Sequence, residues 1–343
     1  MTPSSPPGPA PSSSPKAGAG ALSPWNLPRS SLPALTYSIV ARDPSSGELG
    51  VAVQSHFFSV GSIVSWAEPG VGAVATQSIA EASFGPRGLE LMRDGQSAPA
   101  ALQQLISDDP GEAVRQVALV DRGGRVAVHT GLRCIPHAGH ALGEQVSAQA
   151  NMMERDTVPS AMIRAYTEAR GEPLAERLVA ALDAAEGQGG DIRGRQSAAI
   201  VVVAGRATGT LSEDRPVDLR VEDHADPVPE LRRLLGLRRA YTRASAGDDL
   251  AGAGDLKAAL AEYEAAHLAQ PDNLELAFWY GLALAGNGRE EEAVRVMRAP
   301  FQAHSGWVEL LKRLPEAGII PDDPELIGRL TGTRATWEPE QHL

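Results

Sequence analysis

The stretch TYSIVARDPSSGELGVAVQS, residues 36–55, decides the fold of this chain. Residues 36–43 carry aromatic and β-branched side chains and stop at the turn sequence Pro-Ser-Ser-Gly, and residues 49–55 resume the same extended pattern. Two such runs separated by a turn predict a β-hairpin. Ordered structure is therefore expected to begin at Thr36.

Similar patterns continue to about residue 223. The predicted strands cover residues 62–70, 71–78, 114–131 (a hairpin turned at Gly123–Gly124), 197–205 and 218–223, and the predicted helices cover 84–106 and 158–186. Strands, helices, strands, helices and strands follow one another, which is not the regular alternation of a doubly wound parallel sheet. This order predicts an α+β domain with antiparallel sheets inside and helices outside.

The two ends of the chain differ from this central part. Residues 1–35 hold nine of the 26 prolines and no acidic residue, and we expect them to be disordered because such a segment buries too little apolar surface. From about residue 229 the pattern is almost purely helical. A 34-residue repeat, the period of tetratricopeptide-like helix pairs, relates two sets of residues: Gly254, Ala259 and Tyr263, then Gly288, Ala293 and Met297.

Four parts are therefore expected. They are a leader over residues 1–35, an α+β domain over 36–228, a helical-repeat domain over 229–335 and a tail over 336–343. For the third part, the simpler alternative is a generic helical cap that docks on the α+β domain.

Composition excludes several functions. The 31 Lys and Arg against 43 Asp and Glu give a net charge of -12, so we expect no nucleic-acid partner, because phosphate binding needs clustered cations. Cys134 is the only cysteine, which excludes an internal disulfide. The sequence contains no run of eighteen apolar residues, so no membrane span is predicted. The lack of a clear signal peptide favours the cytoplasm, and the lack of a Walker loop or a G-x-G-x-x-G motif predicts no cofactor.

One group of residues suggests a metal. His129, Cys134, His137 and His140 have the side chains that zinc accepts. Their spacing is not that of a common zinc site, and scattered loop histidines are the simpler interpretation. No metal site is therefore predicted, and a metalloprotein is kept only as a third hypothesis.

Thr36 suggests a different chemistry. If cleavage or an alternative start exposed it, its hydroxyl would lie beside a free α-amine. Such an amine has a pKa of about 7.7–8.0 and can act as a base near neutral pH. It would activate the hydroxyl, which is a weak nucleophile alone. The alternative is an ordinary strand threonine.

Five segments within residues 36–240 together resemble family 1028 of the domains of unknown function. They are the run from Thr36 to Ser78, FGPRGLELMRDG (84–95), VAVHTGLRCIPHAGH (126–140), GGDIRGRQSAAIVVV (189–203) and DLRVEDHADPVPELRRLL (218–235). The resemblance implies membership of the N-terminal-nucleophile (Ntn) hydrolases, which include the proteasome β subunits, and hence a four-layer α-β-β-α sandwich. The C-terminal part resembles a module described in such proteins as peptidoglycan-binding.

The resemblance assigns roles to particular residues. Thr36 falls at the position of the nucleophile. Asp191 and Ser197 resemble the Asp and Ser near the proteasome nucleophile, where they would support the α-ammonium and relay its proton. Six further residues are expected to bind an oxyanion or the substrate: Asn151, Gln77, Arg87, Arg193, Arg195 and Ser55.

The sequence also departs from the proteasome pattern. Residues 62–70 hold no Lys, and Ser55–His56 stands where a carboxylate is expected. Because Arg stays charged and cannot act as a base, proteasome-like peptidase chemistry is not implied. Arg193 and Arg195 suit the carboxylate of a small substrate. Alternatively, they form ion pairs with Asp191 or with an acidic residue at 218.

Two main functions follow. The first is an Ntn amidohydrolase that cleaves a small amide or related C–N bond through a Thr36 ester. The second is a non-catalytic protein that docks a ligand or a cell-wall component through its helical domain. The first requires Thr36 to be freed by self-cleavage, by another protease or by a translation start at Leu35. A homo-oligomer is also expected.

Overall fold

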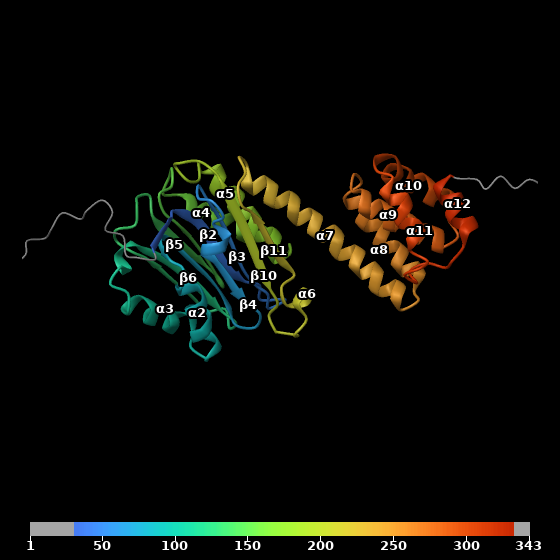
Figure 1. The fold of residues 1–343 in the computed structure, drawn as a ribbon. Coiled ribbons are helices and arrows are strands. Elements are labelled where there is room, and N and C mark those ends of the chain that lie inside the picture. The colour runs from blue at the N-terminus through green and yellow to red at the C-terminus, as the bar shows by residue number, and fades with distance from the viewer. Residues whose placement is uncertain (1–30, 333–343) are drawn as a thin grey trace, which may run out of the picture.

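The computed structural model describes residues 31–332, which form a mixed α/β region followed by a helical region (Figure 1). The α/β region contains two antiparallel sheets. The first has the strand order β1-β5-β6-β7, with β4 also paired to β5, and the second has the order β11-β10-β3-β2-β9-β8.

The first sheet consists of β1 (Ser31–Ala34), β4 (Ser65–Glu68), β5 (Gly72–Glu81), β6 (Arg115–Asp121) and β7 (Val126–Thr130). The second consists of β2 (Thr36–Arg42), β3 (Leu49–Ser55), β8 (Gly139–Gly143), β9 (Val146–Ala150), β10 (Ser197–Val203) and β11 (Val217–Val221). The helices of this region are α1 (Gly61–Val64), α2 (Phe84–Arg93), α3 (Ala98–Ser107), α4 (Val158–Glu168), α5 (Leu174–Gly187) and α6 (Leu211–Asp214), with a short 3-10 turn at Glu112–Val114.

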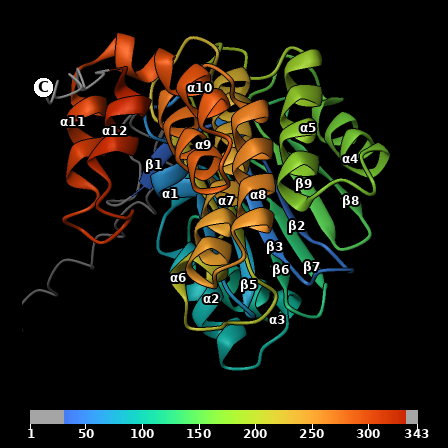
Figure 2. The same ribbon diagram turned by 90° about the vertical axis from the view of Figure 1, so that its right-hand side faces the viewer.

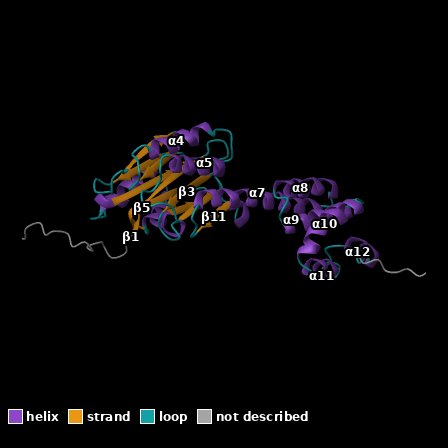
Figure 3. Ribbon diagram, turned by 90° about the horizontal axis from the view of Figure 1, so that it is seen from above, coloured by secondary structure: helices purple, strands orange, loops and turns teal. Residues whose placement is uncertain are grey.

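Three apolar layers hold these elements together. The sheets face each other across small and β-branched side chains such as Val40, Ala75 and Ala199. Helices α2 and α3 cover the outer face of the first sheet, and α4 and α5 cover that of the second (Figures 1 and 3). The predicted succession of strands and helices is thus confirmed in outline, including the hairpins β2–β3 and β6–β7. Residues 62–64 of the predicted strand 62–70 instead belong to α1, and β8 was not predicted.

Side chains of β2 point alternately to the two faces of the second sheet, and each face packs in a different core. Tyr37 and Ile39 belong to the core under α4 and α5, whereas Val40 belongs to the core between the sheets. Because successive side chains of a strand point to opposite faces, Thr36 and Ser38 point towards the other sheet. The first residue of the strand is therefore directed into the space between the sheets.

The predicted leader is wrong in its extent. Residues 31–34 form β1, which pairs antiparallel with β5, and Ala34 is fully buried. Residues 78–81 of β5 extend beyond β4, and their backbone N–H and C=O groups on that edge form hydrogen bonds with residues 31–34. The average composition of residues 1–35 does not reveal that four of them pair with a distant strand. The rest of the leader, residues 1–30, lies outside the described residues, as do residues 333–343.

The helical region follows a single long helix. Its elements are α7 (Pro227–Gly252), α8 (Leu256–Ala269), α9 (Leu274–Gly286), α10 (Glu290–Ala303), α11 (Gly306–Arg313) and α12 (Pro324–Thr331). Figure 1 shows α7 leading from the sheets to these helices, which lie in front of the sheets in Figure 2. Leu231 and Leu235 of α7 pack in the α/β region, whereas Ala240 and Ala244 pack in the helical one. The change of core therefore occurs within α7, a few residues after the expected boundary.

The 34-residue repeat has a structural counterpart. Gly254 and Gly288 lie in the turns after α7 and α9 with φ of 84° and 75°, which favours glycine. Gly281 lets two helices approach closely, because a Cβ there would lie 2.3 Å from Cγ of Met297. Within the part of the chain that the structure describes, no helix has the length and apolar character needed to cross a bilayer.

Candidate functional site

Four polar residues form a row across one end of the second sheet. Ser197 of β10 is paired with Ser55 of β3, and Ser55 with Thr36 of β2. Asn151 follows β9 and its backbone N–H donates to the Thr36 carbonyl (3.1 Å). All four residues are at most 1% exposed. Since directly paired residues have side chains on the same face, the row faces the other sheet.

The Thr36 hydroxyl is the unusual member of this row. It is fully buried, and Oγ1 has no hydrogen-bond partner among the residues that the structure describes. Buried hydroxyls are nearly always paired, so an unpaired one is a candidate for a functional group. In the intact chain its nitrogen is still part of the peptide bond to Leu35.

The carbonyl group of that peptide bond is held by two donors. Ser55 Oγ donates to the Leu35 oxygen at 2.6 Å, and Arg193 Nη2 donates to the same oxygen at 2.7 Å. A hydroxyl and a charged guanidinium on one carbonyl oxygen polarise the C=O bond. They would also stabilise negative charge that develops on the oxygen.

Asp191 positions this guanidinium. Its buried carboxylate accepts hydrogen bonds from Arg193 Nε (3.1 Å) and Nη2 (2.8 Å), and also from the backbone N–H of His56 (3.3 Å). The two-point contact fixes the plane of the guanidinium. Arg193 therefore forms the ion pair that was one of its two predicted roles, and in addition reaches the Leu35 carbonyl.

Buried amides from both sheets hold the Thr36 carbonyl. Gln77 Nε2 and Asn151 Nδ2 donate to the Thr36 carbonyl oxygen at 3.2 and 3.3 Å. Both also donate to Oε1 of Gln116, at 2.7 and 2.8 Å. Gln116 was not among the predicted site residues. Its signal in the sequence is a long polar side chain within the apolar strand run that follows Val114.

Ser197 belongs to the row but serves a loop. Its Oγ donates to the Phe57 carbonyl (2.5 Å) and accepts from the Val60 N–H (3.0 Å). The hydroxyl proton is therefore directed towards the loop after β3. The hydroxyl directly across from Thr36 is that of Ser55.

The structure does not bring two predicted cations into this cluster. Arg195 pairs with Glu186 and with Asp226 (2.6 Å for the latter), and Glu186 also accepts the Tyr37 hydroxyl. Burial, and then the Glu186 carboxylate, raise the pKa of Tyr37 well above its ordinary value. Arg87 is exposed on α2, in the layer outside the first sheet, rather than at the sheet edge.

The residues of the metal hypothesis do not converge. His129 Nε2 lies 2.9 Å from the Glu112 carbonyl, His140 Nδ1 lies 2.9 Å from Thr130 Oγ1, and Cys134 donates to the Arg115 carbonyl. Among residues 31–332, no three His, Cys, Asp or Glu side chains are grouped so as to hold a metal ion.

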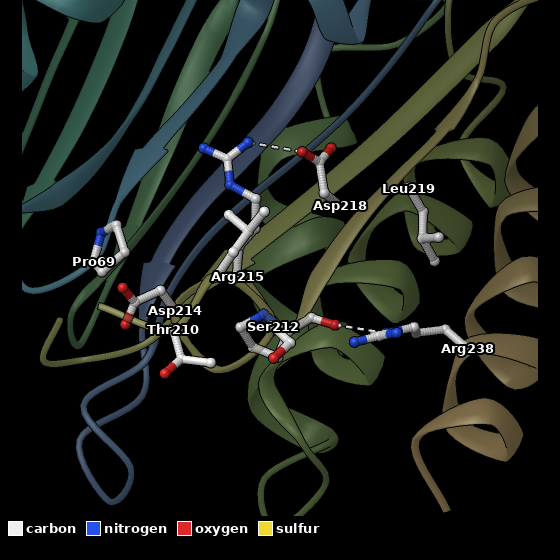
Figure 4. A pocket seen from close by; sticks show the side chains of 10 residues that line it. Pro69, Thr210, Ser212, Asp214, Arg215, Asp218, Leu219 and Arg238 are labelled. Carbon is white, nitrogen blue, oxygen red and sulfur yellow. Dashed lines mark hydrogen bonds and ion pairs between the residues drawn. The ribbon is translucent and has the colours of Figure 1, made fainter. Parts of the chain in front are cut away.

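A large depression lies elsewhere, beside β11, α6 and α7 (Figure 4). It measures about 1100 Å³. Its charged groups already have partners, since Arg215 pairs with Asp218 (2.7 Å) and Arg238 Nε donates to the Pro216 carbonyl (3.0 Å). The depression does not include the row of polar residues, which remains the candidate site.

Comparison with known proteins adds a family and a relative. Residues 36–231, more than half of the chain, match the family model described as a family of unknown function (DUF1028). The crystal structure of protein SPO2555 from Silicibacter pomeroyi, of the same family, is similar with 32% sequence identity and a TM-score of 0.53. The match covers 59% of this chain and 88% of that one. No curated protein matches.

Proposed function

The chain belongs to the family of unknown function DUF1028, and on that premise we propose that it is an Ntn amidohydrolase that cleaves a small amide or related C–N bond through Thr36. One observation carries the proposal. A fully buried hydroxyl, Thr36 Oγ1, has no hydrogen-bond partner within residues 31–332 and follows directly after a carbonyl group that Ser55 and Arg193 polarise.

The fold proposed for this activity is the four-layer Ntn sandwich. The order helix layer, sheet, sheet, helix layer supports it, because α2 and α3 cover one sheet and α4 and α5 cover the other. The position of Thr36 supports it as well, because Thr36 is the first residue of β2 and its side chain faces the space between the two sheets.

The proposed reaction has two steps. Once Thr36 is N-terminal, its α-amine takes the proton of Oγ1, and Oγ1 attacks the carbonyl carbon of the substrate. The C–O bond forms, the C–N bond breaks, and the leaving amine takes the proton. Water then hydrolyses the Thr36 ester and restores the hydroxyl. Ser55 Oγ and Arg193 Nη2, which hold the Leu35 oxygen, would hold the oxyanion in both steps.

Asp191 acts in this scheme through Arg193 and through its buried negative charge. The carboxylate is buried beside Arg193 and would stabilise the ammonium that forms when the α-amine takes the Oγ1 proton. Ser197 is poorly placed for the predicted proton relay, because its hydroxyl donates to the Phe57 carbonyl, and Ser55, which is paired directly with Thr36, serves the oxyanion instead.

Release of Thr36 can use the same groups. If Thr36 Oγ1 attacks the Leu35 carbonyl carbon, the negative charge develops on the oxygen that two donors already bind. The C–N bond to Thr36 breaks, its nitrogen takes the proton that Oγ1 gives up and becomes the free α-amine, and water releases the leader from the ester. This arrangement favours self-cleavage over the other two routes to a free Thr36.

The intact mass and N-terminal sequence of the purified full-length chain test the proposal. We expect a chain that begins at Thr36, and we expect Thr36→Ala to remain intact and to release no amine from a panel of small amides. Thr36→Ser is the matched control, since it keeps a hydroxyl and should keep both activities. The proposal would be contradicted if the purified Thr36→Ala chain still cleaved its own peptide bond after Leu35, or if a chain without a free Thr36 showed amidase activity.

One observation favours the second function, a binding protein. The helical region encloses a cavity of about 430 Å³ lined mainly by apolar side chains, including Tyr263, Trp279 and Ile320. A cell-wall component or other ligand docked there should bind the full chain, and Trp279→Ala should weaken that binding at least tenfold. Unchanged binding of soluble cell-wall fragments in this variant would remove the helical region as the docking surface.

A further inference from the structure

We infer that the substrate of this site is a short extended peptide whose acyl side adds as a strand to the free edge of β5, in the place that residues 31–35 occupy in the intact chain. The inference rests on the proposed function of Thr36 and specifies the substrate class of the same site. It also means that the leader closes the site until it is released.

The backbone of β1 provides the first argument. Ser31 is paired with Glu81 and Ala34 with Ser78, all antiparallel. The opposite edge of β5 is taken by β6, and β4 takes residues 72–75 of the edge that β1 uses. Residues 78–81 therefore lose their partner strand when the leader leaves. An open edge of this kind binds extended peptides through main-chain hydrogen bonds.

The end of β1 provides the second argument. The leader runs along β5 and delivers the Leu35 carbonyl to Ser55 Oγ and Arg193 Nη2. The Thr36 hydroxyl follows directly. A peptide bound in the same register would place its own carbonyl group on the same two donors. The strand-pairing edge, the two carbonyl donors and the nucleophile thus follow one another along the path of the bound chain. This order would bring the carbonyl carbon of a bound peptide next to the Thr36 hydroxyl.

The side chains of the leader indicate which residues such a peptide should have. Ala34 is fully buried and belongs to the apolar core between the sheets, together with Val40 and Ala80. Leu35 is 6% exposed. The residue that donates the carbonyl should therefore be apolar, and the residue before it should be small and uncharged, because a buried charge without a partner is strongly unfavourable.

The edge that receives the peptide is held firmly. Arg115 is 2% exposed, pairs with Asp109 and donates from Nη1 to the Ile79 carbonyl (2.6 Å). Ser78 has φ of 71°, which is uncommon for a residue other than glycine. Such a backbone conformation persists only where the surrounding structure imposes it. Ser78 is paired with Ala34, the residue just before Leu35 and its polarised carbonyl.

Hydrogen exchange on the full chain tests the inference without relying on catalysis. In a Thr36→Ala background, which cannot cleave the leader, Ala34→Asp should release β1, and Ala34→Ser is the matched control. We expect the amides of residues 78–81 to exchange at least tenfold faster in Ala34→Asp only. Acetyl-Ser-Leu-Pro-Ala-Leu-amide at millimolar concentration should restore slow exchange. The same peptide with Asp in its fourth position should not.

Unchanged exchange in Ala34→Asp, or faster exchange that the first peptide fails to slow, would overturn the inference. If Ala34→Asp does not fold, a chain with glycine at all of residues 31–34 replaces it, because glycine disfavours a strand without adding a charge. Amidase activity that depends on Thr36 but comes with no peptide binding would sink this inference and leave the proposed function standing. Peptide binding without any amidase activity would keep the β5 edge as a peptide-binding site but refute the proposed function, and with it the role of the peptide as a substrate.

Discussion

Replacing Gln116 by Met tests how strongly the buried amides hold the site together. Gln116 accepts hydrogen bonds from Gln77 and Asn151 and donates from Nε2 to Thr130 Oγ1 (2.9 Å) and to the carbonyls of Gly139 (3.1 Å) and Ala150 (3.0 Å). Methionine keeps the length of the side chain and removes all of these contacts.

The magnitude follows from what each partner retains. Gln77 and Asn151 still have the Thr36 carbonyl as an acceptor, whereas the three acceptors of Gln116 lose its donor. Nε2 carries only two N–H groups for its three acceptors, so about two bonds of about 1 kcal/mol each are lost and the free energy of unfolding of the α/β region should fall by about 2 kcal/mol. For a region of this size, that lowers the midpoint of thermal unfolding by about 4–8 °C.

Differential scanning calorimetry of the full chain is the assay, with Gln103→Met as the control. Gln103 is exposed on α3, so its replacement should change the free energy of unfolding by less than about 0.5 kcal/mol. A loss below about 1 kcal/mol in Gln116→Met, similar to the control, would refute the reasoning. It would mean that the buried amides are not stabilising partners of one another.

Two further predictions concern regions away from the site. Burial acts to raise the pKa of Asp43, but hydrogen bonds from the following turn and the Arg177 charge outweigh it and lower that pKa. The stabilisation is therefore present above the unfolded pKa of about 3.9 and is lost as pH falls through the lower folded value. Asp43→Asn should lower the free energy of unfolding by about 3 kcal/mol at pH 7. In urea unfolding from pH 2 to 7, the free energy of unfolding of this variant should depend less on pH than that of the parent. In the helical region, Gly281→Ala should cost about 1–3 kcal/mol, because the new Cβ would lie 2.3 Å from Met297 Cγ, whereas Gly286→Ala meets nothing within 4 Å and should gain about 0.5–1 kcal/mol. Equal calorimetric effects of the two alanines would contradict the close approach.

The elements that the sequence predicted well are those that local chemistry determines. The hairpins β2–β3 and β6–β7 depend on strand-forming residues and on turns at Pro44–Gly47 and Gly123–Gly124, all within a few residues of one another. The continuous apolar run of β10 likewise identified a strand buried on both faces. These patterns need no knowledge of the rest of the chain.

The contacts that escaped prediction depend on distant pairing. The pairing of Ala34 with Ser78 joins two segments through an edge that the sequence does not mark as open. The role of Gln116 depends on which side chains the other sheet presents to it. Conversely, Arg87 was predicted to bind an oxyanion or the substrate, whereas helix geometry turns it outward on α2, beside the Phe84 ring.

The shared helix α7 has a consequence for how the two regions are set relative to each other. One uninterrupted helix of 26 residues joins them, and an α-helix advances about 1.5 Å and turns about 100° with each residue. The number of residues between Leu235 and Ala240 therefore sets both the spacing and the angular phase of the two regions. A single residue inserted there would swing the helical region about a quarter of a turn around the axis of α7. A seven-residue insertion would lengthen the link by about 10 Å and almost restore the original facing.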